Sequence, residues 1–136
     1  DIPVMAGFAL NALRATAGVD DDIAALRKVA TLTSAFLGVT SGARGVDWLD
    51  RNGGPHHMPA FPVHTVDTLG AGDVFHGAFT LAVAESQPLE QGLRFASAAA
   101  ALKCTRFGGA FGSPQRSEVA DFLTSGVVGT PACPSR

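Results

Sequence analysis

The chain has 136 residues, of which 46% are hydrophobic and 16% are charged, and its formal net charge is -2 at pH 7. These values indicate a globular chain that buries a hydrophobic core, and they argue against intrinsic disorder. The near-neutral charge gives no indication of nucleic-acid binding. No apolar run reaches the eighteen residues that a membrane span requires, so we expect neither a nucleic-acid nor a membrane partner.

The first half of the chain alternates between helical and strand patterns. Apolar residues at helical spacing predict two helices, and short apolar or alternating runs predict strands. The helices are expected at residues 8–17 and 20–30, and the strands at residues 1–5, 35–40, 46–49 and 57–64. Asn52-Gly53-Gly54 is a strong hairpin signal between the last two strands.

The second half is helical. We expect helices at residues 71–86, 89–105 and 114–125, with a glycine-rich loop at residues 107–112. The first of these helices is apolar almost all round, which predicts burial on more than one side. Its apolar surface needs more sheet than these residues provide, so we expect the chain to be part of a larger α/β domain.

The two cysteines bear on the cellular compartment. Cys104 lies in an alanine-rich apolar run, and Cys133 lies in a proline-containing tail. This arrangement favours two free thiols in a reducing environment. No basic segment followed by an apolar stretch opens the chain, so no secretory signal is visible. Together these observations predict a cytoplasmic location.

The segment from Asp67 to Asp73 reads Asp-Thr-Leu-Gly-Ala-Gly-Asp and leads into the apolar helix. Glycines let backbone N–H groups crowd around an anion, and a helix start adds exposed N–H groups and the positive end of its dipole. A carboxylate at such a place suggests a base that works beside a phosphate, as phosphoryl transfer needs. The structural alternative is a helix-capping aspartate. No Gly-Lys-Ser/Thr sequence exists, so this is not a Walker A loop.

This motif and the Val74-Phe75-His76-Gly77-Ala78-Phe79 that follows it resemble the C-terminal signature of the ribokinase-like (PfkB) family of carbohydrate kinases. The resemblance covers roughly residues 8–125. It implies an α/β fold, the ribokinase-like three-layer α/β/α sandwich with a Rossmann-like sheet, of which this chain is the C-terminal portion. We expect residues 1–126 to form the nucleotide-binding and catalytic-base half of the kinase domain, and residues 127–136 to be a tail.

The resemblance implies that Asp73 is the catalytic base, contacting the sugar hydroxyl and deprotonating it as it attacks the γ-phosphate of ATP. It also implies that Gly70, Ala71 and Gly72 supply an anion hole from their backbone N–H groups. A tight turn from strand to helix is the simpler interpretation of the same glycines, and both can hold together.

Two further segments resemble the nucleotide-binding parts of the family. One borders the phosphates and ribose, and a plain hairpin turn is its alternative. The other wraps the adenine, and close packing of small residues between helices is its alternative. The first comprises Thr40, Gly42 and Gly45, and the second comprises Ser97, Ala98, Ala101, Gly108 and Gly109.

Many members of the family also hold a monovalent cation, such as potassium, beside the anion hole. The matching ligands here would be the Asp67 side chain and backbone carbonyls around Leu69, Lys103, Arg106 and Gly108. Two departures bear on this site: Lys103 replaces a small residue, and Gly112 stands where relatives often have serine. Mg²⁺ is expected with ATP, held mainly by phosphates and water. The glutamate that relatives carry upstream is absent.

The expected function is therefore ATP-dependent phosphorylation of a sugar hydroxyl, with the sugar and ATP as partners. A nucleoside or vitamin kinase of the same family is an alternative, and so is a non-catalytic nucleotide-binding relative. We expect the isolated chain to be inactive and any homodimer to form through residues outside it.

Overall fold

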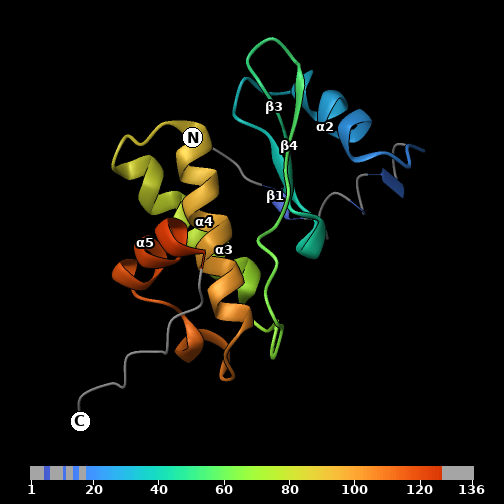
Figure 1. The fold of residues 1–136 in the computed structure, drawn as a ribbon. Helices are drawn as coiled ribbons and strands as arrows, with labels where there is room; N and C mark the ends of the chain where they lie inside the picture. Colours follow the sequence, from blue (N-terminus) through green and yellow to red (C-terminus); the bar gives the residue numbers. More distant parts are fainter. Residues whose placement is uncertain (1–4, 7–10, 12–13, 16–17, 127–136) are drawn as a thin grey trace. The chain divides into compact units, whose positions relative to one another are not determined.

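The computed structural model describes residues 5–6, 11, 14–15 and 18–126. The chain divides into two compact units, residues 1–60 and 61–136, which are described separately below (Figure 1). Most of the helix expected at residues 8–17 and the expected tail, with Cys133, lie outside the described residues. Asn11, Arg14 and Ala15 are described and are helical. In the described part of the chain, no helix is long and apolar enough to cross a membrane.

The first unit is built on a four-stranded sheet whose strands lie in the order β1-β2-β3-β4. β1 pairs in parallel with β2, and the other two pairings are antiparallel. The strands are β1 (Met5–Ala6), β2 (Gly38–Thr40), β3 (Val46–Leu49) and β4 (Pro55–Met58).

The strand at residues 46–49 and the hairpin after it are confirmed. The strand expected from residue 35 begins only at Gly38. The strand expected at residues 57–64 is wrong, because β4 begins at Pro55 and ends at Met58. Pro59 lacks the backbone N–H that would continue the ladder, so the pairing stops there.

Helix α2 (Asp22–Ala30) packs on one face of this sheet. Asp21 caps the helix, since its side chain accepts a hydrogen bond of 2.7 Å from the Ala24 N–H. Ala25 and Leu26 are fully buried and belong to one hydrophobic cluster with Leu37, Val39 and Leu49. The helix expected at residues 20–30 is thereby confirmed.

The turn of the β3–β4 hairpin is organised by Asp50. Its Oδ1 accepts hydrogen bonds of 2.8 Å from the N–H groups of Asn52 and Gly54, and its Oδ2 lies 3.0 Å from His56 Nε2. The contact with His56, followed by the two backbone N–H groups, lowers the pKa of Asp50. The His56 ring also stacks on Trp48, its cross-strand partner.

Gly45 precedes β3, after a 3₁₀ turn over Gly42–Arg44. Its φ is +104°, and a Cβ atom there would lie 2.0 Å from the Met58 carbonyl oxygen. Gly42 also has a positive φ, of +56°, but a Cβ atom there would meet nothing within 4 Å. Of these two glycines, only Gly45 lies so close to another strand that a side chain is excluded.

We predict that Gly45→Ala destabilises the first unit far more than Gly42→Ala. Gly42→Ala should lower the unfolding free energy by about 1 kcal/mol, because alanine disfavours the left-handed backbone conformation. Gly45→Ala has the same conformational cost and must also displace the end of β4. Trp48 is the only tryptophan of the chain, so urea unfolding followed by its fluorescence reports on this unit. Equal losses of unfolding free energy in the two variants would contradict the prediction.

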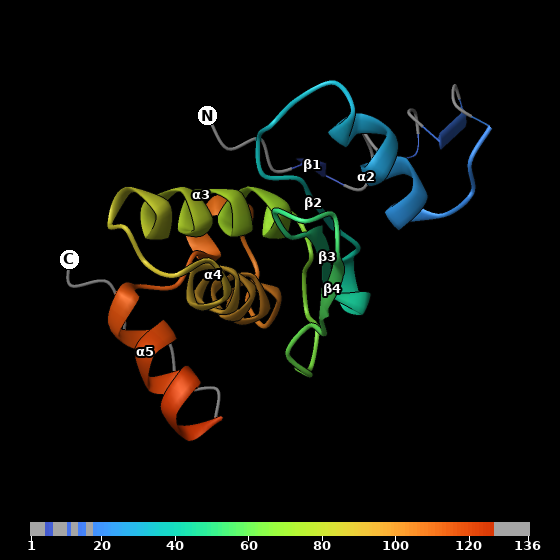
Figure 2. The same cartoon turned by 90° about the horizontal axis from the view of Figure 1, so that it is seen from above.

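The second unit consists of helices. They are α3 (Ala71–Ala84), α4 (Leu89–Cys104) and α5 (Arg116–Ser125), with a 3₁₀ turn, η2, over Gly109–Gly112. α4 contacts both α3 and α5. In Figure 2, α4 is seen almost along its axis while α3 runs across the view, so these two helices cross. The three expected helices are confirmed to within two residues at each end.

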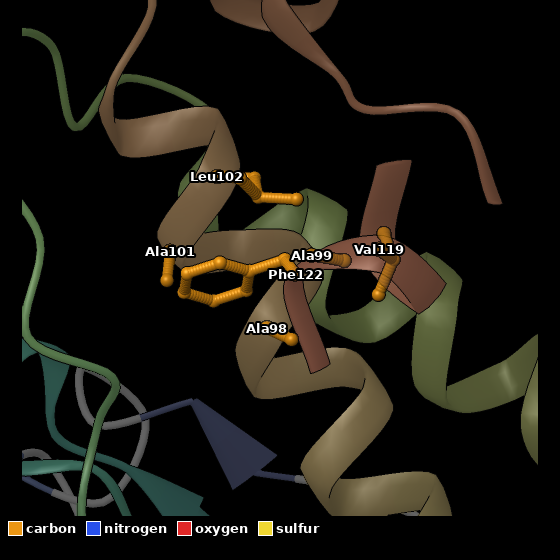
Figure 3. Packing of buried hydrophobic residues seen from close by; sticks show 6 residues of the cluster. All are labelled: Ala98, Ala99, Ala101, Leu102, Val119 and Phe122. Carbon is orange, nitrogen blue, oxygen red and sulfur yellow. The ribbon is translucent and has the colours of Figure 1, made fainter. Parts of the chain in front are cut away.

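The core of the second unit lies between α4 and α5. Half of its buried residues are alanines on α4, whose small side chains let α5 approach closely (Figure 3). The ring of Phe122 also meets that of Phe61, with centroids 5.3 Å apart. The cluster comprises Ala98, Ala99, Ala101, Leu102, Val119 and Phe122.

Helix α3 buries one side within its unit. Phe75, Phe79 and Ala82, spaced at one helical face, are its buried residues, and Leu81 is 44% exposed. The expected burial on more than one side is therefore not found within this unit. At the buried side the helices approach closely, since a Cβ atom on Gly92 of α4 would lie 3.2 Å from the Ala82 Cβ.

We predict that Phe122→Ala lowers the unfolding free energy of the second unit by about 3–5 kcal/mol, because it leaves a cavity between α4 and α5. Phe111→Ala is the matched control, since that side chain is fully exposed, and we expect a change within about 0.5 kcal/mol. Denaturant unfolding followed by far-ultraviolet circular dichroism measures both. Similar losses in the two variants would contradict this account of the core.

Candidate active site

The N-terminus of α3 is the centre of the candidate site. Its N-cap is Gly70, in the left-handed conformation with φ of 78°. The Ala71 N–H donates to the Thr68 carbonyl at 3.1 Å, and the Val74 N–H donates to the Gly70 carbonyl at 3.0 Å. Between them, the N–H groups of Gly72 and Asp73 have no acceptor within the described residues. This end of the helix therefore presents two free donors and a partial positive charge.

Asp73 stands in the first turn of α3 and is exposed. Its carboxylate accepts no hydrogen bond from the described part of the chain. The helix-capping alternative is not observed, because Gly70 is the N-cap and no side chain caps it. The carboxylate is therefore free to take a proton from a bound molecule, beside N–H groups that attract an anion.

An open cavity of about 560 Å³ lies beside these groups. α3 contributes Asp73 to its lining, α4 contributes Phe95 and Ala99, and the start of α5 contributes Arg116. Leu69, Gly70, Gly109 and Ala110 complete the end of the cavity nearest the helix start. Asp73 and Arg116 are the charged groups of this lining, and Arg116 is paired with Glu85 at 2.5 Å.

Asp67 ties the loop before α3 to the loop after α4. Its Oδ1 accepts from the Leu69 N–H at 2.9 Å, and its Oδ2 accepts from the Gly108 N–H at 3.3 Å. The N–H groups of Val66 and Asp67 both donate to the carbonyl of Cys104, at 2.7 and 3.1 Å. The hydrogen bond from Leu69 is the largest cause that lowers the pKa of Asp67, and Lys103 lowers it further.

The Lys103 side chain is fully buried behind this turn. Its Nζ donates to the Asp67 carbonyl at 2.9 Å, to the Arg106 carbonyl at 3.2 Å and to Asp67 Oδ2 at 3.4 Å. The ammonium group thus contacts two of the oxygens that the resemblance assigns to a potassium ion, the Arg106 carbonyl and the Asp67 carboxylate, so such an ion does not fit beside it. Leu69 and Gly108, whose carbonyls were also predicted as ligands, donate hydrogen bonds from their N–H groups to the Asp67 carboxylate.

The other predicted site residues are dispersed. Gly109 lines the cavity, but Ala98 and Ala101 are buried in the cluster between α4 and α5. Ser97 is also buried, at 9% exposure, and does not line the cavity. Of the three proposed anion-hole residues, Ala71 has its N–H engaged by Thr68. The remaining three, Thr40, Gly42 and Gly45, belong to the first unit.

The sequence interpretation noted that Lys103 replaces a small residue near the cation site, but it did not predict that the side chain is buried there. A signal for it existed in the helical periodicity. Lys103 follows Ala96 and Ala99 at intervals of seven and four residues, on the buried face of α4. A lysine on such a face needs buried acceptors nearby.

Comparison with known families matches residues 6–116 to the pfkB family carbohydrate kinase family. The chain belongs to the pfkB family of carbohydrate kinases. The resemblance drawn from the Asp67–Asp73 motif is thereby confirmed, since the match includes this motif and the helices that carry it.

The similar proteins include ribokinases. The chain is 43% identical to the ribokinase of Bacillus subtilis over 95 residues, which are 68% of this chain and 31% of that protein. The structure of Thermotoga maritima ribokinase matches with a TM-score of 0.83 and 35% identity, over 90% of this chain and 41% of that one. Arabidopsis thaliana ribokinase, solved with ribose and ATP, matches with a TM-score of 0.80 and 31% identity, over 90% and 40%.

These likenesses confirm the predicted ribokinase-like α/β fold. The chain spans less than half the length of each of these ribokinases. That residues 1–126 are the C-terminal part of a kinase domain stays a prediction.

We predict that the free energy of unfolding depends less on acid in Asp67→Asn than in the wild type. Because the folded protein lowers the pKa of Asp67 below the ordinary 3.8, the charged carboxylate stabilises the fold above that pH, and this contribution is lost as the pH falls through the lower folded value. The variant should be less stable than the wild type at pH 7, and the gap should shrink from about pH 4 downward. Urea unfolding across this range measures the gap, and a constant gap would contradict the prediction.

Proposed function

We propose that the protein containing this chain transfers the γ-phosphoryl group of ATP to a hydroxyl of a sugar, with Asp73 as the general base. One observation carries the proposal: an exposed carboxylate without a partner among the described residues stands beside the free N–H groups at the start of a 14-residue helix. Membership of the pfkB carbohydrate kinase family supports this interpretation.

In the proposed reaction, the sugar hydroxyl gives its proton to the Asp73 carboxylate as its oxygen attacks the γ-phosphorus. The bond between that phosphorus and the bridging oxygen breaks, and ADP leaves with the electron pair. The N–H groups of Gly72 and Asp73 stabilise the charge on the transferring group, since they are fixed before the reaction begins. Most of the rate enhancement would come from positioning and charge stabilisation.

The nucleotide is the second part of the proposal. We assign Thr40, Gly42 and Gly45 to its phosphates and ribose, and Gly108 and Gly109 to the region of the adenine. The buried Ser97, Ala98 and Ala101 could reach the adenine only if their helix repacked, so we assign them to packing. Mg²⁺ would bind together with ATP and be held mainly by phosphates and water.

Ribose is the first sugar to test, because the similar proteins described above are ribokinases and one of them was solved with ribose and ATP. A nucleoside or a vitamin stays an alternative acceptor, and a nucleotide-binding relative without activity is the alternative of another class. The cytoplasmic location and a homodimer formed through residues outside the chain also stay predictions.

The test uses the complete product of the gene that encodes these residues. We predict ADP release with Mg-ATP and ribose, and a loss of about 10²-fold or more in kcat for Asp73→Asn, because the amide cannot accept the hydroxyl proton. ATP binding should remain within a few-fold of the wild type. Asp121→Asn is the matched control, since Asp121 is exposed on α5, and it should keep full activity.

Two outcomes would contradict this proposal. Asp73→Asn with an unchanged kcat would remove Asp73 as the base. ATP binding without phosphorylation across a panel of pentoses, hexoses, nucleosides and vitamins would favour the inactive relative. Turnover on an acceptor other than ribose would retain the mechanism and replace the substrate.

A further inference from the structure

Lys103 is a charged side chain with no exposure to solvent. Burying an ammonium group is costly unless its donors are all met by acceptors. The three N–H donors of Lys103 face three oxygens, the carbonyls of Asp67 and Arg106 and the carboxylate of Asp67. The site therefore provides what a compact monovalent cation needs: converging oxygens and one negative charge.

The oxygens belong to the two loops that build the end of the cavity. Asp67 lies three residues before Gly70, the N-cap of α3, and Arg106 lies three residues before Gly109. Gly70 and Gly109 both line the cavity. A cation bound by these oxygens therefore fixes the position of the N–H donors at the start of α3 relative to η2, the glycine turn at Gly109–Gly112.

Gly112 makes room for the lysine. It is buried, and a Cβ atom there would lie 3.1 Å from Cδ of Lys103 and 3.1 Å from the Phe107 carbonyl oxygen. The aliphatic stem thus lies closer to residue 112 than a side chain there would ordinarily allow, so a Cβ atom would require the stem to shift. Lys103 and Gly112 are the two positions at which the sequence departs from the cation-binding pattern that the resemblance implies, and the lysine stem lies next to the glycine.

We propose that the Lys103 ammonium replaces a monovalent cation at this site, so that the protein needs no potassium to order the loops at the start of α3. Lys103 is a positioning residue in this account, because it acts through Asp67 and does not touch the reacting atoms. The catalytic part of the inference rests on the proposed kinase function, whereas the structural part does not.

The structural part is tested on the 136-residue chain by thermal unfolding in potassium chloride and in choline chloride at equal ionic strength. We expect the Tm of the wild type to be the same in both salts. Lys103→Ala vacates the position of the ammonium and leaves its three acceptor oxygens without a cation. Its Tm in choline should therefore fall by at least about 5 °C, and it should rise again in potassium.

Lys103→Met is the matched control. It keeps a stem of similar length, which blocks the space, and it removes the charge. Its Tm should fall in both salts, and potassium should not restore it. Restoration of Lys103→Ala without restoration of Lys103→Met identifies a vacated cation site, which a purely structural lysine would not give.

The catalytic part is tested with the complete gene product. The kcat of the wild type should be the same within about two-fold with and without potassium, and Lys103→Ala should be stimulated at least about tenfold by potassium. If neither the wild type nor Lys103→Ala has kinase activity, the proposed function is contradicted. The Tm data then still test the inference that Lys103 replaces a cation. A wild-type Tm or kcat that potassium raises selectively would overturn it. A failure of Lys103→Ala to respond to potassium, including a failure to fold in it, would overturn it as well.

Discussion

The contact between the Lys103 ammonium and Asp67 is the constraint on which the candidate site depends. It joins the end of α4 to the loop before α3, and its lysine side chain is fully buried. The carboxylate of Asp67 adds hydrogen bonds from Leu69 and Gly108, so both loops are fixed to one side chain. Because a half-satisfied buried charge is costly, this arrangement either forms completely or is lost.

The exposed groups of the candidate site depend on this buried contact. The turn that Asp67 stabilises delivers Gly70 in its left-handed conformation, and this conformation starts α3 with free N–H groups at Gly72 and Asp73. The crossing of α3 and α4 then supplies the apolar walls of the cavity. Just after the end of α4, Arg106 binds Glu118 with contacts of 2.7 and 3.3 Å, and Glu118 also accepts from the N-cap N–H of α5. The glycine turn is therefore held from two directions.

Local signals predicted much of this fold. Helical periodicity, the aspartate cap of α2 and the Asn-Gly-Gly hairpin located most elements, because each depends on neighbours in sequence. The prediction of β4 failed, because the strand ends at a proline whose effect depends on its partner strand. The motif located Asp73 and its glycines. Spacing also places Lys103 on the buried face of α4, but it could not predict which oxygens accept from its ammonium. That contact depends on how α4 packs, and on the absence of a side chain at Gly112.

The central claim is that the start of α3 binds the phosphoryl group in transfer. It is tested most directly by amide NMR of the complete gene product with ribose, Mg-ADP and aluminium fluoride, which mimics that group. The account predicts that the N–H signals of Gly72 and Asp73 show the largest shifts when aluminium fluoride joins the ribose and Mg-ADP complex, because they are the free donors beside the base. Shifts that leave these two signals unchanged and gather elsewhere would contradict it.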